Sequence, residues 1–343
     1  MPKILVISQT HHLLPLAWRL KQEGNEVDVI VARDSFEPAW AGKFEKLLRG
    51  RKKRESQGPV AEAAKESEAI VLTDSTDWAK QFKGYERLFA MSANEPASPL
   101  PEVQLGAWFD GEGFMGAHLL VEDVGLWPGG MGPSVPGGMT MFVPQEMPEA
   151  WMRALGTLGD PLKSEGFRGL VRAGISLDPE APLESEPQLL GYQAGWNFLQ
   201  MHAFSGLLDS PNLTQLLEGF QPDLYHRFTV ALPVTIAPWP LRGLRSEVSC
   251  NLNAKQVPIG LEAVKTGQVF LHDMMVRDGQ IQTAGLDGLV AVVRWSGQGF
   301  GFVRHKALET AGMLQLPEAQ YRLDVGAGVG QVLMMLEELG LTL

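Results

Sequence analysis

Short β-branched runs alternate with helical patterns in the N-terminal part of the chain. The three runs, each typical of a buried strand, are residues 3–8, 26–31 and 69–73. Apolar residues from Leu14 to Leu20 recur at helical spacing, and the charged stretch 41–67 is also expected to be helical. Strands joined through helices pair in parallel. We therefore expect residues 1–75 to form a Rossmann-like α/β unit.

The pattern changes further along the chain. Residues 76–102 are polar and aromatic with an end rich in Pro, Ser and Ala, which is typical of a connector. A loop is expected at 127–138, which is too rich in Gly, Pro and Met for regular structure, and a helical stretch at 194–220. Short strands account for much of the rest, and the expected ones are 103–109, 116–121, 169–177, 188–192 and 228–236.

The C-terminal part follows a polar linker at 243–256. Its expected strands are 267–271, 280–283 and 288–293, after which the chain ends on helices. We expect a core at 103–242 and a β-rich domain at 243–343. The expected fold class is therefore α/β, or α+β overall.

The amino-acid composition limits which classes of binding partner are expected. Hydrophobic residues make up 45% of the chain, yet the apolar stretches end before the roughly 18 residues that a membrane span needs. The first residues lack a secretory cleavage site, so we expect a cytoplasmic protein with no membrane partner. A net charge of −11 makes nucleic acid an unlikely partner, and the basic run at 51–54 is interpreted as a solvated surface.

Common catalytic signatures are missing from the sequence. Cys250 is the single cysteine, so it cannot form an intramolecular disulfide. No nucleophile elbow, P-loop or paired-cysteine motif is present. The histidines show no metal-ligand spacing, and each is interpreted as an isolated polar or packing residue: His11, His12, His118, His202, His226, His272 and His305.

The tail carries the first of three motifs that resemble one enzyme family. Residues 267–293, GQVFLHDMMVRDGQIQTAGLDGLVAVV, and 321–326, YRLDVG, resemble the C-terminal domain of glycinamide ribonucleotide synthetase, also called phosphoribosylamine–glycine ligase. That family has a Val-Phe-His-Ala-Gly-Thr strand, a Thr-x-Gly-Gly-Arg-Val-Leu turn and a closing Tyr-Arg-x-Asp-Ile-Gly in the same order. The resemblance implies an ATP-grasp-like synthetase with a β-rich C-terminal domain.

The middle motif is GPSVPGGMTMF at 132–142, which resembles the Gly-Pro-Asn-Thr-Gly-Gly-Met-Gly loop beside the family's reaction centre. Glycines let backbone N–H groups approach an anion closely. The candidate ligand contacts here are Ser134, Gly137, Gly138 and Met139, although the same residues also suit a tight connection between strands. The family's basic His-Lys-Arg triplet aligns with the unrelated residues Asp123-Val124-Gly125.

The N-terminal motif is KILVISQTHHLLPLAWRL at 3–20, in which Ala17-Trp18 sets the register of the resemblance. The glycines that would hold a phosphate between strand and helix are replaced by Ser8, Thr10 and His11. These three residues are candidate anion contacts, with an ordinary helix start as the other interpretation.

The nucleotide and metal sites of the family have no clear counterpart. The resemblance implies a lysine-bearing nucleotide lobe before the strand at Val103, but only the short segment 74–102 stands there. The family's magnesium-binding Leu-Glu-Phe-Asn becomes Leu190-Gly191-Tyr192-Gln193, which keeps only the amide of Gln193 as a side-chain ligand.

Our leading hypothesis is a phosphoribosylamine–glycine ligase-like pseudoenzyme, a homologue from purine biosynthesis and nucleotide metabolism whose ATP/Mg site is degenerate. It would bind a small anion, such as a sugar phosphate or an amino acid, or a protein partner or second copy that supplies the missing lobe. No cofactor or metal is expected. The alternative is a divergent ATP-dependent carbon–nitrogen ligase that joins an amino acid to a nucleotide or sugar-phosphate amine. It would need ATP and Mg, with Arg168, Arg172 and Gly137-Gly138 as anion contacts.

Overall fold

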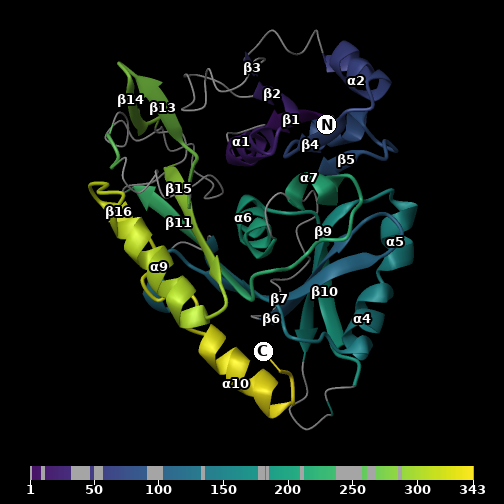
Figure 1. Ribbon diagram of the computed structural model, residues 1–343, viewed down its shortest axis with the longest axis vertical. Helices are drawn as coiled ribbons and strands as arrows, with labels where there is room; N and C mark the ends of the chain where they lie inside the picture. Colours follow the sequence, from purple (N-terminus) through teal and green to yellow (C-terminus); the bar gives the residue numbers. More distant parts are fainter. Residues whose placement is uncertain are drawn as a thin grey trace.

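The described part of the computed structural model contains two large sheets, which pack against each other through a buried helix, and one small two-stranded sheet (Figure 1). The structure describes residues 2–8, 12–31, 47–49, 57–90, 103–132, 136–176, 182, 185–208, 212–236, 257–260, 268–284 and 288–342. Within these ranges, no helix combines the length and the apolar character that crossing a bilayer requires.

The N-terminal sheet has five parallel strands in the order β3-β2-β1-β4-β5. Its strands are β1 (Lys3–Ser8), β2 (Glu26–Val31), β3 (Leu47–Arg49), β4 (Ile70–Thr73) and β5 (Leu88–Ala90). α1 (Leu14–Gln22) covers one face, while α2 (Gln57–Glu66) and α3 (Thr76–Gln81) cover the other. Because both faces are covered, the central strands are continuous apolar runs, which is why the sequence reveals them.

Two expectations for this unit are corrected. The stretch 41–67 is not one helix, because β3 lies within it and α2 begins at Gln57. The described part of 76–102 is more than a connector. β5 completes the parallel sheet and α3 packs against it, with Trp78, Phe82 and Phe89 buried. A six-residue helix and a three-residue strand are too short for either periodicity to be visible in the sequence.

The second sheet has nine strands and is antiparallel. Its main order is β10-β9-β6-β7-β8-β11-β15-β12, and β16 also pairs with β11. The bounds are β6 (Val103–Phe109), β7 (Phe114–Val124), β8 (Pro136–Phe142), β9 (Gly169–Ser176), β10 (Gln188–Ala194), β11 (Phe228–Ile236), β12 (Val269–Leu271), β15 (Leu289–Gly297) and β16 (Ala319–Gln320). The sheet thus continues from the expected core into the expected C-terminal domain. A separate hairpin comprises β13 (Met274–Arg277) and β14 (Gln280–Thr283).

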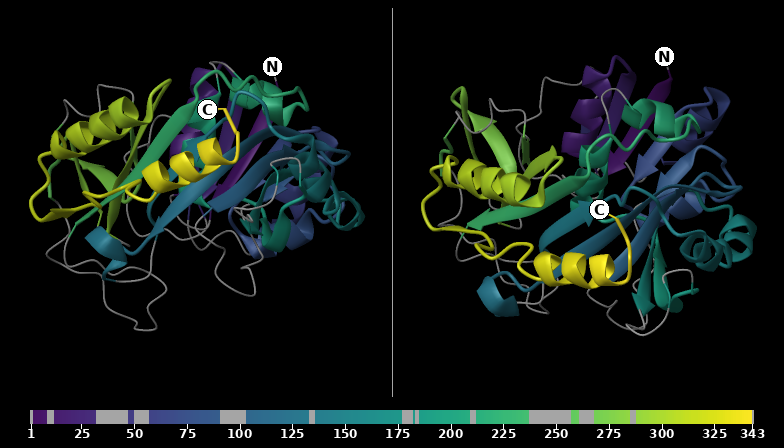
Figure 2. Two further views of the ribbon diagram at one scale, coloured as in Figure 1. Left: turned by 90° about the horizontal axis from the view of Figure 1, so that it is seen from below. Right: turned by 60° about the horizontal axis from the view of Figure 1, so that its bottom comes forward.

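Helices cover both faces of this sheet. On one face lie α4 (Glu149–Gly156), α9 (Phe300–Gly312) and α10 (Val329–Glu338), and Figure 2 shows α9 and α10 following one another along the outside of the sheet. On the other lie α6 (Phe198–Leu207) and α7 (Asn212–Leu217), while α5 (Gly159–Ser164) packs beside β9 and β10. Every residue of α6 from Leu199 to Leu207 is buried, because α6 lies between the sheet and the N-terminal unit.

The Gly-rich stretch 127–138 is only partly a loop. A 3₁₀ turn occupies Pro128–Gly130, but β8 begins at Pro136 and pairs with β7. The expectation of irregular structure through residue 138 is therefore corrected. Glycine is tolerated in this strand because another segment of backbone approaches it closely.

Candidate functional site

The candidate contacts inferred from the sequence do not form one cluster. Thr10, His11 and Ser134 lie outside the described residues, as do the basic run 51–54 and Cys250. The others occupy three places: the end of β1 (Ser8), the first half of β8 (Gly137, Gly138 and Met139), and β9 with β10 (Arg168, Arg172 and Gln193).

Arg172 is held in a closed polar cluster on the face of the sheet that α6 covers. It lies opposite Gln193 in the register of β9 and β10. Its Nε donates to Gln193 Oε1 at 2.6 Å, and its Nη1 donates to Glu122 Oε2 of β7 at 2.5 Å. The side chains of Arg172 and Glu122 are only 8% and 13% exposed, so the pair is largely removed from water. This guanidinium already has its counter-charge within the protein.

Arg168 is placed apart from this cluster. It precedes β9 and packs against the turn at Gly111, where an added Cβ would lie 2.9 Å from its Nε. Arg168 and Arg172 are four residues apart along the strand direction, roughly 13 Å. The two arginines therefore do not converge on one small anion.

Gly137 and Gly138 are enclosed by protein. A Cβ on Gly137 would lie 2.1 Å from the carbonyl oxygen of Gly125, and one on Gly138 would lie 2.4 Å from Val325 Cγ2. Both residues are buried. The geometry favours the tight-connection interpretation of this motif over a ligand loop, because neighbouring protein atoms fill the space that an anion would need.

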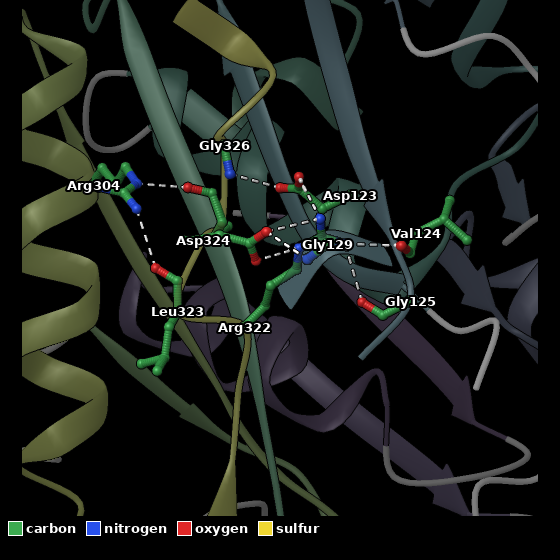
Figure 3. A network of polar contacts seen from close by, with 10 residues as sticks. Asp123, Val124, Gly125, Gly129, Arg304, Arg322, Leu323, Asp324 and Gly326 are labelled. Atoms are coloured by element: carbon green, nitrogen blue, oxygen red, sulfur yellow. Dashed lines mark hydrogen bonds and ion pairs between the residues drawn. The ribbon is translucent and has the colours of Figure 1, made fainter. Parts of the chain in front are cut away.

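The closing segment 321–326 binds to the turn that follows β7 (Figure 3). Arg322 Nη1 donates to the carbonyl oxygens of Val124 and Gly125 at 2.8 and 3.2 Å, and its Nε donates to Asp324 Oδ1 at 2.8 Å. The Gly326 N–H donates to Asp123 Oδ2 at 2.7 Å. Thus Asp123, which stands where the resemblance would place a basic residue, anchors the C-terminal segment.

Asp324 is the second carboxylate of this network. Its Oδ2 accepts the Gly129 N–H at 2.8 Å, in addition to the contact with Arg322. Partial burial opposes the charge, but the hydrogen bonds from Gly129 and Arg322 outweigh it and lower the pKa of Asp324 below its ordinary value. Two of the three motifs behind the resemblance therefore meet in a structural contact.

Ser8 lies at the carboxyl end of β1, but its hydroxyl donates to Asp74 Oδ2 at 2.7 Å. A carboxylate in that position disfavours an anion beside Ser8. The N-terminal sequence motif predicts that β1 ends at Ser8. The hydrogen bond to Asp74, which follows β4, could be identified only from the structure.

Three histidines meet between the N-terminal unit and the large sheet, contrary to the interpretation of each as isolated. His202 Nε2 on α6 lies 3.1 Å from His272 Nε2, and the His12 ring centroid lies 5.6 Å from that of His272. Burial lowers the pKa of His202 to about 3, and the charges of Arg294, Arg19 and His12 add to the shift. Nothing in their spacing along the chain could have revealed this cluster.

No metal centre accompanies these groups. Among the residues that the structure describes, no set of three His, Cys, Asp or Glu side chains is placed to hold a metal ion. Gln193, the remaining amide of the expected magnesium motif, accepts its hydrogen bond from Arg172.

A cavity of about 690 Å³ lies between α1, α6 and β15, away from all these candidate contacts. Its walls include Trp18, Arg19, Ser205, Phe270, Arg294 and Trp295. The sequence did not indicate it, because these residues come from four distant segments and none of them was a candidate contact in the motifs.

Comparison with known proteins identifies the fold. No protein-family model matches the chain, and no curated protein matches it by sequence. Among solved structures, phosphoribosylamine–glycine ligase from Thermotoga maritima is similar with a TM-score of 0.62 at 14% identity, over 94% of this chain and 100% of that chain. The biotin carboxylase domain of a single-chain bacterial carboxylase gives 0.56 at 10%, over 99% of both chains. Kluyveromyces lactis urea carboxylase gives 0.54 at 11%, over 91% of this chain and 30% of that one. The chain therefore has an ATP-grasp-like α/β fold with a parallel N-terminal sheet and a large antiparallel sheet.

Proposed function

We propose that this protein is a phosphoribosylamine–glycine ligase-like pseudoenzyme that binds a small anion and does not carry out ATP-dependent ligation on its own. The observation that carries the proposal is the closed cluster around Arg172. Its guanidinium is occupied by Glu122 and Gln193, at the place where the resemblance would put metal and nucleotide groups.

Chain length between the two sheets supports the same conclusion. β5 ends at Ala90 and β6 begins at Val103, so the chain has only residues 91–102 for a nucleotide lobe. A lobe that closes over ATP needs at least a few paired strands, and each typically uses five or six residues before any turn is counted.

The enclosed glycines provide independent support. An anion that approached the backbone of Gly137 or Gly138 would have to displace the turn at Gly125 or the side chain of Val325. Those neighbours are in turn fixed by the contacts of Arg322 and Asp123.

The test is titration of ATP and Mg²⁺ into the purified protein by calorimetry, with and without glycine and phosphoribosylamine, while ADP release is followed separately. We expect neither binding heat in the micromolar range nor ADP. Amine-dependent ADP release by the wild type would contradict the proposal and establish the rebuilt ligase instead. The control is the Arg172→Met variant, in which activity from a contaminating enzyme would persist unchanged.

A further inference from the structure

Arg294 on β15 brings a positive charge to the cavity, and no carboxylate among the described residues forms an ion pair with it. Its Nη1 donates to Ser205 Oγ at 2.9 Å, and its guanidinium lies over the Phe270 ring, 4.7 Å from the centroid. The residue as a whole is partly exposed, yet its Nε is shut off from water and has no hydrogen-bond partner in the part of the chain that the structure describes.

A charged group in this position destabilises the folded protein unless a hydrogen-bond acceptor or an opposite charge pairs with it. Buried polar atoms are nearly always hydrogen-bonded, and an unpaired charge removed from water destabilises the protein. Burial lowers the pKa of Arg294 to about 9, and the nearby charge of Arg19 adds to the shift. Arg294 is thus still protonated at neutral pH, and a bound anion would relieve the penalty.

Glu23, the acidic residue among those that line the cavity, is already paired with other groups. Glu23 accepts from Arg19 Nε at 3.0 Å through Oε1, and its Oε2 accepts from the backbone N–H and the hydroxyl of Thr214. Arg19 also donates from Nη1 to the carbonyl oxygen of Ser205 at 3.1 Å. Ser205 therefore joins two arginines, of which only Arg19 has a carboxylate partner.

Aromatic side chains stand among the polar groups of the remaining walls. Trp18 of α1, Phe270 of β12 and Trp295 of β15 line the cavity. The Trp295 side chain, however, points to the other face of the sheet, where its Nε1 donates to Thr310 Oγ1 of α9 at 2.8 Å. Trp18 and Phe270 are therefore the aromatic rings on the cavity side. A volume of about 690 Å³ falls within the range of small-molecule sites, which join apolar walls to a few placed polar groups.

We propose that the cavity between α1, α6 and β15 binds a small organic oxyanion whose acidic group pairs with Arg294 and whose apolar or aromatic body lies against Trp18 and Phe270. Guanidinium groups bind carboxylate and phosphate through two parallel hydrogen bonds, so either acid would fit this chemistry. The inference rests on the anion-binding part of the proposed function and assigns the charge contact to Arg294, which lies outside the motifs that carry the resemblance and was not among the candidate contacts.

Four probes test this site by calorimetry: benzoate, phenyl phosphate, inorganic phosphate and the neutral benzamide. Benzoate or phenyl phosphate should bind at least about tenfold more tightly than inorganic phosphate or benzamide, and the better of the two identifies the acid. Arg294→Met should weaken that probe about tenfold or more, as expected for losing hydrogen bonds to a charged group. The matched control is Arg277→Gln, which changes a half-exposed arginine of β13 and should leave the affinity unchanged.

Melting temperatures distinguish binding from a structural role. Without probe, Arg294→Met should melt at or above the wild-type temperature, because an unpaired charge is removed. If Arg294→Met does not fold, Arg294→Lys replaces it and should still lose several-fold in affinity, because lysine lacks the planar fork.

Failure of all four probes to bind the wild type, or equal binding by wild type and the Arg294 variant, would overturn the inference. Neither result concerns ATP turnover, which remains the separate test of the ligase question.

Discussion

At the scale of single residues, two arginines differ in what faces their guanidinium groups. Arg172 has Glu122 and Gln193 as acceptors, so its surroundings are complete. Arg294 has a serine hydroxyl and an aromatic ring. An arginine paired with a carboxylate is typical of a structural contact, whereas an arginine without one is a candidate for binding an anionic ligand. Strand periodicity predicts that Arg172 lies in a strand and that Arg294 directly follows one, whereas β15 in fact continues to Gly297. The pattern cannot say which of the two arginines has an acid opposite.

The completeness of the Arg172 cluster gives a testable prediction. Glu122→Ala leaves a largely buried guanidinium without its counter-charge and should lower the free energy of unfolding by about 3 kcal/mol. Adding Arg172→Met should recover much of that loss, because the stranded charge is then gone. Urea unfolding of both variants measures this, and a double variant no more stable than Glu122→Ala would contradict a purely structural pair.

Buried histidines predict sensitivity to acid. Burial lowers the pKa of His118 to about 4 and that of His202 to about 3, both below the value near 6.5 of an unfolded chain. Between about pH 6.5 and pH 4, these histidines therefore bind protons in the unfolded state but not in the folded state. The free energy of unfolding should fall as the pH drops through this range, by up to about 1.4 kcal/mol per pH unit for each histidine.

The measurement is the free energy of unfolding in urea at pH 7, 6 and 5. His202→Gln should show a shallower decline than the wild type, whereas the exposed His305→Gln should show the same decline. Identical slopes for wild type and His202→Gln would rule out this linkage.

At the scale of elements, sequence patterns predict β1, β2, β11 and β14 with the bounds that the structure has. Each is either a continuous buried run or is bounded by clear turn residues. β3, β5 and β13 were not predicted, because each is only three or four residues long and shows neither a β-branched apolar run nor a clear alternation of its own. In the sequence, the glycines of β8 suggest a loop. In the structure they belong to a strand, and the closing segment 321–326 packs on them.

Replacing glycine by alanine should have opposite effects on stability at Gly137 and at Gly156. Gly137→Ala would drive a Cβ into the backbone oxygen of Gly125 and should destabilise the protein by about 1–3 kcal/mol or more. Gly156→Ala, at the end of α4, meets open space and should stabilise it by up to about 1 kcal/mol. Thermal melting of the two variants checks the contrast, and similar melting temperatures would contradict the close approach at Gly137.

At the scale of the whole molecule, α6 is the element that joins the two sheets. It is buried from Leu199 to Leu207, and its Phe204 packs against Trp108 and His118 of the large sheet. The same core cluster contains α1 and the facing residues of β1 and β4. The sequence indicates a helix in this region, but its position between two units follows only from the topology.

Phe204→Ala tests whether the two sheets unfold as one. Loss of a fully buried phenyl ring should cost about 3–5 kcal/mol. Because the core cluster is shared, amides of both β1 and β11 should exchange faster by a similar factor. Hydrogen exchange followed by mass spectrometry reads both strands at once, and loss of protection confined to β11 would show that the N-terminal unit folds independently.

The contact between Asp123 and the closing segment limits which changes of sequence remain open to this chain. Asp123 accepts the Gly326 N–H, and Arg322 lies 3.8 Å from its other oxygen. A basic residue at this position, as in the ligases that the chain resembles, would orphan that N–H and face a cation. Adopting that basic residue would therefore require Arg322 and Asp324 to change as well, because the single substitution would give a less stable protein. The fold thus makes the ligases' motif accessible to this chain only through several coordinated substitutions.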